Sequence, residues 1–189
     1  PLGALDPKIT ESINHLATVR LARIAKSIGI PRFIFASSCS IYGFSESGWV
    51  AETAAVNPLT EYAESKAQSE IELVELMDDS FTPVMLRNAT AYGLSARMRF
   101  DLVLNNLVGC AVTSGQLRIM SDGTPWRPMI HIRDIAKACL RALEAPKDSG
   151  AGQILNVGSE DQNHQVNSIA SAASKAVADA QVLYTGEHG

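Results

Sequence analysis

Apolar residues recur every three to five positions in several stretches of the chain, which is the spacing of a helix with one buried face. The clearest stretch covers residues 6–28 and is followed by Gly29, a residue that commonly ends a helix. The same spacing predicts further helices at residues 60–77, 100–114, 134–144 and 165–180. Residues 184–189 follow the last of these, and the sequence predicts no closing strand or helix there.

Short runs rich in β-branched, aromatic and other apolar residues separate the predicted helices. The strongest are Arg32–Ser38 and residues 83–88, and weaker ones occupy residues 117–120, 128–132 and 154–157. In the first half of the chain, each strand is followed by a helix. This alternation predicts an α/β fold built on a parallel sheet.

Composition and charge narrow the class of protein. The chain has 189 residues, 46% of them hydrophobic, which suits one substantial core. A net charge of −4 disfavours a nucleic-acid partner. No apolar run approaches the roughly 18 residues of a membrane-spanning helix. The three cysteines are widely spaced and form no CxxC motif, so we expect no disulfide framework and no structural metal, and a reducing cytoplasm fits.

Tyr62 and Lys66 lie four residues apart in the predicted helix at 60–77, so their side chains leave the same face one turn apart. An ammonium group beside a phenol favours the phenolate, so this pair can act as a general base near neutral pH. The motif alone is weak, because an exposed Tyr resting on a Lys stem occurs by chance in many helices.

The strand Arg32–Ser38 ends in hydroxyl groups, and ligands of open parallel sheets bind beyond the carboxyl ends of the strands. There Ser38 can either hydrogen-bond a reacting oxygen or cap the end of the strand. Tyr42 and Gly43 follow four and five residues later, and Tyr62 comes twenty residues after Tyr42.

The whole pattern resembles the extended short-chain dehydrogenase/reductases, specifically the NAD-dependent epimerase/dehydratase group that acts on nucleotide sugars. In that group a strand ending Ser-Ser-x-x-x-Tyr-Gly precedes Tyr-x-x-x-Lys by about twenty residues. The resemblance implies that Ser38 is the catalytic hydroxyl, that Tyr62 is the acid/base, and that Lys66 binds the nicotinamide ribose.

Asn14 begins a segment that resembles the family's Asn-Val-x-Gly-Thr, with departures at His15 and Ala17. The resemblance makes Asn14 a cofactor-side residue, and an ordinary polar helix position is the alternative.

Residues 122–134 resemble the family's Asp-Gly-x-x-x-Arg-x-x-x-His-Val-x-Asp signature. The arginine of this signature binds the substrate diphosphate, and the resemblance gives that role to Arg127. A planar guanidinium suits that task. Asn105 and Asn106 add diphosphate contacts in this interpretation, or are ordinary residues of a helix surface.

Three further residues of these motifs are expected to have structural and not catalytic roles. Arg87, in the strand after the predicted catalytic helix, is expected to be an ion-pair partner. His131 is expected to be packed and hydrogen-bonded, not catalytic. Asp134 is expected to cap a helix or to stabilise its first turn.

The family also carries a Gly-rich turn that holds the pyrophosphate, and this sequence has none. Its only G-x-G, at residues 150–152, precedes a strand instead of following one. The start at Pro1 without Met adds to the interpretation of a chain cut from a longer protein. We expect the missing part to contain at least two βαβ units, on the order of 60 residues, and the chain alone to hold NAD weakly and to be inactive.

The resemblance implies a Rossmann-like doubly wound parallel sheet lacking its N-terminal strands, with a small α/β substrate-binding lobe. Residues 1–93 are assigned to the NAD-binding domain and residues 94–189 mainly to the lobe, with about 128–145 returning to the first domain. The cofactor is NAD, and the residues that distinguish it from NADP are not in the sequence. The resemblance further implies a homodimer at full length.

The predicted activity is epimerisation of a nucleotide-diphosphate sugar by transient oxidation. Dehydratases of the group carry Asp-Glu after the catalytic hydroxyl, where this chain has Cys39 and Ser40, so no dehydratase activity is expected. The alternatives are an NAD(P)-dependent carbonyl reductase and, from another class, an inactive fragment or a non-catalytic binding module.

Overall fold

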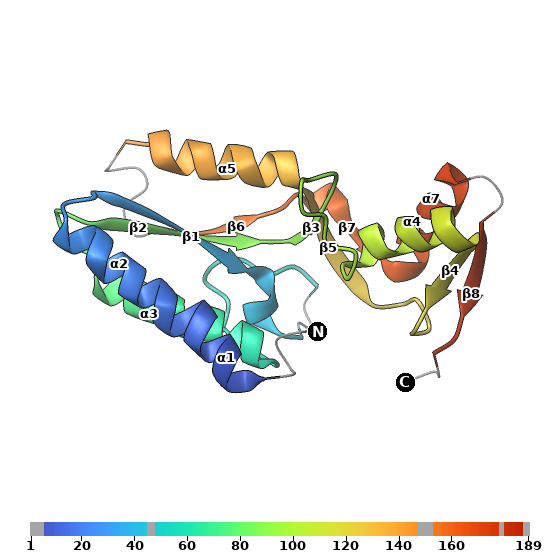
Figure 1. Cartoon of the computed structure of the whole chain (residues 1–189), viewed down its shortest axis with the longest axis horizontal. Helices are drawn as coiled ribbons and strands as arrows, with labels where there is room; N and C mark the ends of the chain where they lie inside the picture. The colour runs from blue at the N-terminus through green and yellow to red at the C-terminus, as the bar shows by residue number, and fades with distance from the viewer. Residues whose placement is uncertain (1–5, 45–47, 147–152, 178–179, 187–189) are drawn as a thin grey trace. The chain divides into compact units, whose positions relative to one another are not determined.

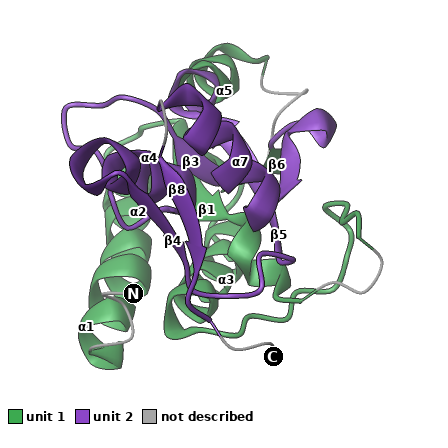
Figure 2. Cartoon of the chain, turned by 90° about the vertical axis from the view of Figure 1, so that its right-hand side faces the viewer, with its two compact units in different colours: residues 1–88, 136–157 green, residues 89–135, 158–189 purple. Residues whose placement is uncertain are grey.

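The chain forms two compact units in the computed structural model, which describes residues 6–44, 48–146, 153–177 and 180–186. The first unit comprises residues 1–88 and 136–157, and the second comprises residues 89–135 and 158–189 (Figure 2). The segment that returns to the first unit is therefore 136–157, whereas the prediction from the sequence was about 128–145. The boundary differs because residues 128–131 belong to a strand that pairs within the second unit.

Over the residues that the structure describes, the first unit is built on a parallel sheet of three strands in the order β1 (Arg32–Ser38), β2 (Thr82–Asn88) and β6 (Ile154–Val157). This confirms the predicted parallel sheet. Alternate side chains of β2 point to opposite faces, so Met85 packs in one apolar cluster while Val84 and Leu86 pack in another.

Helices cover both faces of this sheet (Figure 1). On one face lie α2 (Ala17–Ser27) and α3 (Glu61–Glu75), packed through a shared cluster. On the other lies α5 (Ile132–Glu144), whose Ala142 is buried against β2. The helix α3 begins at Thr60, whose side-chain oxygen accepts a hydrogen bond from the backbone N–H of Ala63 at 3.2 Å.

The predicted helix at residues 6–28 forms, but it contains an irregular turn. It consists of α1 (Pro7–Glu11), the π-helical turn η2 (Ser12–Leu16) and α2. Asp6 caps its start by accepting the N–H of Ile9 at 3.0 Å. The short 3₁₀ turn η3 (Cys39–Tyr42) follows β1 directly.

The second unit has its own core and two small sheets. In one sheet β4 (Gln116–Ile119) runs parallel to β8 (Gln181–Tyr184). In the other, β5 (Trp126–His131) pairs with the parallel β3 (Thr90–Tyr92) and the antiparallel β7 (Asn163–Gln165). The remaining elements are α4 (Val103–Ser114), the 3₁₀ turn η4 (Glu160–Gln162) and α7 (Val166–Ala176).

The end of the chain differs from the prediction. The predicted helix at 165–180 ends at Ala176, and β8 then adds a strand where no closing strand was expected. The prediction was wrong there because the strand is only four residues long and is stabilised by its partner β4 and by the packing of Val182 against the core.

Among the residues that the structure describes, no helix combines the length and the apolar character needed to cross a membrane.

Candidate functional site

Tyr62 and Lys66 lie on one face of α3, as the sequence predicts. The Lys66 ammonium lies 5.7 Å from the centroid of the Tyr62 ring, and Tyr62 is 40% exposed. Lys66 also donates a hydrogen bond to the backbone carbonyl of Ala36 on β1 at 2.9 Å, and lies 4.7 Å from the centroid of the Phe35 ring. Burial lowers the pKa of Lys66 by disfavouring its charged form.

Ser38 ends β1 and caps the 3₁₀ turn η3. Its Oγ accepts hydrogen bonds from the backbone N–H of Ser40 at 3.2 Å and from the Ser40 hydroxyl at 2.9 Å. The capping interpretation of Ser38 therefore describes its local geometry. The cap does not use up the group, because a hydroxyl that accepts two bonds still has its own proton to donate.

Asn14 lies in the π-helical turn η2. Such turns release a backbone carbonyl from the regular helical pattern. The carbonyl of Asn14 accepts hydrogen bonds from Thr18 Oγ1 at 2.9 Å and from Ser69 Oγ on α3 at 3.1 Å. The structure thus positions the backbone of Asn14 against α3, and the role of its side chain toward a cofactor stays a prediction.

A buried ion pair joins α3 to β2. Arg87 donates to both carboxylate oxygens of Glu70, with Nη2 2.7 Å from Oε2 and Nε 3.1 Å from Oε1. The two side chains are only 4% and 5% exposed. Burial by itself lowers the pKa of Arg87, but the hydrogen bonds to Glu70 and Tyr42 raise it overall, so the guanidinium stays charged. The interpretation of Arg87 as an ion-pair partner is confirmed.

Glu70 and the polar network around this pair were not predicted from the sequence. Arg87 Nη1 donates to the Tyr42 hydroxyl at 2.8 Å, and that hydroxyl donates to Asn156 Oδ1 on β6 at 2.7 Å. Glu52 joins the network through its carbonyl, which accepts from Arg87, and through its carboxylate, which accepts from the Asn156 N–H. Two features of the sequence could have indicated the ion pair: Arg87 stands inside a buried strand, and Glu70 follows Lys66 by one helical turn.

The predicted substrate-binding residues lie in the second unit. Asn105 is buried, and its amide donates to the carbonyl of Arg99 at 3.0 Å and accepts from the N–H of Gly93 at 3.4 Å. Asn106 donates to the carbonyl of Phe100 at 2.9 Å. Both amides therefore hydrogen-bond the loop before α4. The alternative that Asn105 is an ordinary residue of the helix surface is wrong, because Asn105 is buried.

Arg127 is exposed on β5, where its guanidinium donates to the carbonyl of the preceding Trp126 at 2.8 Å. Most of its five N–H donors remain outside this bond. Its predicted contact with a diphosphate stays a prediction.

His131 is packed, as expected. Its ring meets the ring of Tyr92 edge-on, with centroids 5.3 Å apart, and its Nδ1 accepts the N–H of Arg133 at 3.2 Å. Gly93 has φ of 117°, and a Cβ there would come within 2.7 Å of the His131 ring. Asp134 lies in the first turn of α5, which agrees with its predicted structural role.

Ser38, Tyr62, Lys66 and Asn14 thus all belong to the first unit, while Asn105, Asn106 and Arg127 belong to the second. Within the described part of the chain, no group of three or more His, Cys, Asp or Glu residues is arranged to hold a metal ion, and the three cysteines are free thiols. The G-x-G at 150–152 lies outside the described residues.

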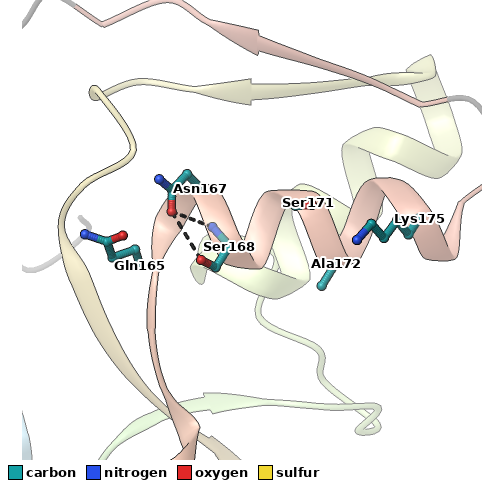
Figure 3. A pocket seen from close by; sticks show the side chains of 6 residues that line it. All are labelled: Gln165, Asn167, Ser168, Ser171, Ala172 and Lys175. Atoms are coloured by element: carbon teal, nitrogen blue, oxygen red, sulfur yellow. Dashed lines mark hydrogen bonds between the residues drawn. The ribbon is translucent and has the colours of Figure 1, made fainter.

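A shallow, open hollow on α7 contains none of the predicted residues (Figure 3). Asn167 and Ser168 are hydrogen-bonded to each other there. Its lining is about equally polar and apolar and comes from the start and one face of a single helix: Gln165, Asn167, Ser168, Ser171, Ala172 and Lys175.

A parallel sheet covered by helices on both faces, with a Tyr-x-x-x-Lys helix packed on it, defines a Rossmann-like unit of the extended short-chain dehydrogenase/reductase type. The model of the NAD dependent epimerase/dehydratase family matches residues 2–158, and the chain belongs to this family.

Curated relatives include the "Uncharacterized UDP-glucose epimerase YtcB" of Bacillus subtilis (strain 168), which is 31% identical over 147 residues, or 77% of this chain and 45% of the relative. A UDP-glucose 4-epimerase of Rhizobium leguminosarum bv. trifolii is 29% identical over 81% of this chain and 51% of its own length. The chain therefore spans about half the length of the curated relatives that it matches.

Solved structures show the same fold. MoeE5 in complex with UDP-glucose and NAD is 26% identical with a TM-score of 0.79, over 93% of this chain and 58% of that chain. UDP-glucuronic acid 4-epimerase from Bacillus cereus, in complex with UDP-glucuronic acid and NAD, is 26% identical with a TM-score of 0.80, over 92% and 55%. The predicted fold class is confirmed.

Proposed function

We propose that this chain carries the catalytic residues of an NAD-dependent nucleotide-sugar epimerase. The observation that supports the proposal most directly is the pairing of Tyr62 with Lys66 on α3, beside the end of the strand that delivers Ser38. Relatives that are UDP-glucose 4-epimerases and solved complexes with UDP-sugars and NAD support the same reaction class.

The residues around Tyr62 fit the nicotinamide-ribose part of NAD. An ammonium group has three N–H donors, and the bond from Lys66 to Ala36 takes one of them, which leaves donors for ribose hydroxyls. Asn14 lies in the neighbouring turn η2, and its backbone carbonyl accepts a hydrogen bond from Ser69 of α3. Because the sequence has no Gly-rich turn after a strand, this chain supplies only this part of a dinucleotide site. Bound NAD would supply the acceptor, and then the donor, of the hydride that leaves and returns to the sugar carbon.

Tyr62 acts in this proposal as the base that takes the proton of a sugar hydroxyl and as the acid that later returns it. The positive charge of Lys66 stabilises the phenolate, which brings a phenol with a reference pKa of about 10 into use nearer neutral pH. Ser38 keeps its proton and uses it to donate a hydrogen bond to the reacting oxygen. The proton count balances, because the proton that leaves the hydroxyl is the one that goes back.

The substrate class follows from the second unit. Arg127 offers a planar, exposed guanidinium that suits a diphosphate, and we assign it the main contact. The side-chain amides of Asn105 and Asn106 donate hydrogen bonds to carbonyls of the loop before α4. In this proposal the two residues shape that loop or add secondary contacts with the diphosphate. Cys39 and Ser40 supply no carboxylic acid, so the proposal favours epimerisation over dehydration.

The test is turnover of a panel of nucleotide sugars by the intact protein. We expect interconversion of C4 epimers, loss of at least 100-fold in kcat with Tyr62→Phe, and full activity with the control Tyr184→Phe, a comparably exposed tyrosine on β8. Equal rates for the wild type and Tyr62→Phe would overturn the assignment. A 4-keto-6-deoxy product would replace the epimerase proposal with a dehydratase.

A further inference from the structure

Three residues of α3 occupy successive turns of one face. Tyr62, Lys66 and Glu70 are spaced by four residues each, so their side chains project in the same direction along the helix. The first two belong to the proposed catalytic set, and Glu70 has no part in the mechanism described so far.

Consecutive turns of α3 contact consecutive residues of β1. Lys66 donates to the carbonyl of Ala36 at 2.9 Å, and the hydroxyl of Ser37 donates to Glu70 Oε1 at 2.5 Å. Ser38 is the next residue of the strand. The contact of Glu70 is the more deeply buried of the two, with Glu70 4% and Ser37 3% exposed.

The neighbouring strand β2 also binds the carboxylate of Glu70. Arg87 of β2 is the register partner of Ser37, and it binds both oxygens of Glu70. Arg87 also donates to the hydroxyl of Tyr42, the last residue of the turn that Ser38 caps. One carboxylate on α3 is thus tied to both strands and, through Arg87, to the turn after Ser38.

An apolar cluster also packs α3 against the sheet. Leu73, Phe81 and Met85 are fully buried in the apolar cluster between α3 and the sheet. A buried ion pair adds little net stability relative to well-packed apolar side chains, because both charges lose their hydration. The ion pair instead restricts geometry. A bidentate pair is directional, so it limits how far α3 can shift along its axis relative to the sheet.

We propose that Glu70, clamped by Arg87 and Ser37, is a positioning residue that fixes the axial register of α3 so that Tyr62 and Lys66 stand in the geometry needed beside Ser38. This inference rests on the proposed function. It assigns a role in the reaction to residues that touch neither the substrate nor the cofactor.

The test replaces the pair by apolar side chains in the intact protein. The double variant Glu70→Leu/Arg87→Met removes one charge of each sign, so the net charge near Lys66 is unchanged while the directional bonds are lost. We expect a melting temperature within a few degrees of the wild type, an unchanged KM for the nucleotide sugar, and a kcat reduced at least tenfold. The control is Arg23→Gln on α2, which breaks the exposed pair with Glu72, leaves the bond between Glu72 and His15 in place, and should leave kcat unchanged.

A second variant covers the case in which the double variant fails to fold. Ser37→Ala removes one hydrogen bond and leaves the ion pair, and we expect a several-fold loss of kcat with KM unchanged. A folded double variant with wild-type kcat, or Ser37→Ala with wild-type kcat, would overturn the clamp.

A readout independent of turnover separates this inference from the proposed function. Trace labelling of lysine amines, followed by peptide mass spectrometry, reports the accessibility of Lys66 whether or not the protein is an epimerase. We expect Lys66 to label several-fold faster in the double variant than in the wild type and in Arg23→Gln. A wild type without epimerase activity would refute the proposed function alone, and unchanged labelling of Lys66 in the double variant would refute the clamp.

Discussion

The hydroxyl of Ser69 on α3 donates a hydrogen bond to the backbone carbonyl of Asn14, 3.1 Å away in the π-helical turn η2. Ser69 is fully buried, and its single hydroxyl proton is shared between this carbonyl and the carbonyl of Ser65 in its own helix, 2.7 Å away. One side chain therefore links the irregular turn to the helix that carries Tyr62 and Lys66.

Removing this hydroxyl should have a measurable cost. Ser69→Ala leaves the carbonyl of Asn14 with one side-chain donor fewer, and we expect a loss of about 1 kcal/mol in the free energy of unfolding, measured by urea denaturation. Ser27→Ala is the control, because its hydroxyl is exposed and bonds only the carbonyl of Ile24 in its own helix. Equal effects of the two variants would contradict the importance of the link.

Removal of Arg87 alone should be far more harmful than removal of an exposed arginine. Arg87→Met leaves the buried Glu70 carboxylate without its cation, and we expect a loss of about 3–5 kcal/mol. Arg23→Met breaks an ion pair with Glu72 whose members are 63% and 30% exposed, and should cost less than about 1 kcal/mol. Chemical denaturation of both variants tests the difference. Similar losses would show that burial does not decide the strength of these pairs.

The carboxyl of Asp101 should titrate at unusually low pH. Hydrogen bonds from Arg99 lower its pKa to about 2, below the unfolded value of about 3.9. A depressed folded-state pKa means that the stabilisation is present above the unfolded value and is lost as the pH falls from about 4 to about 2. Its size should stay under about 1 kcal/mol because both side chains are exposed.

Carbon-detected NMR titration of Asp101 checks this value directly. The pKa of Asp101 should rise toward the ordinary range in Arg99→Gln. An Asp101 that already titrates near pH 4 in the wild type would show that the pair does not form in solution.

Gly93 should tolerate no side chain. Its φ of 117° is unfavourable for other residues, and a Cβ would meet His131 Nε2 at 2.7 Å, so we expect Gly93→Ala to cost about 2–3 kcal/mol. Gly29 also has a positive φ, of 80°, but a Cβ there meets nothing within 4 Å. Gly29→Ala should therefore cost only about 1–2 kcal/mol. Thermal unfolding of the pair separates backbone strain from the clash with His131.

Local signals explain what could be predicted from the sequence. The helix α3 has a capping residue at Thr60 and a spacing of Tyr62 and Lys66 that brings both to one face in any regular helix. The strands β1 and β2 each contain a continuous apolar run, residues 33–36 and 83–86, as is typical of buried parallel strands.

Features that depend on distant partners could not be predicted. The pairing of Glu70 with Arg87 joins two elements through the fold, and the burial of Asn105 depends on the path of the loop from Gly93. The strand β8 is too short to show a period of its own and forms against β4. The π-helical turn differs from an α-helix by less than one residue per turn, so apolar spacing does not reveal it.

The bond from Lys66 to Ala36 also affects how the sheet meets its surroundings. In the described part of the chain β1 is an edge strand, and edge strands expose backbone groups that can pair with another strand. The ammonium of Lys66 occupies one of these backbone acceptors. Because Lys66 keeps further donors for ribose hydroxyls while it holds this carbonyl, one side chain serves the proposed site and also occupies a backbone acceptor at the sheet edge.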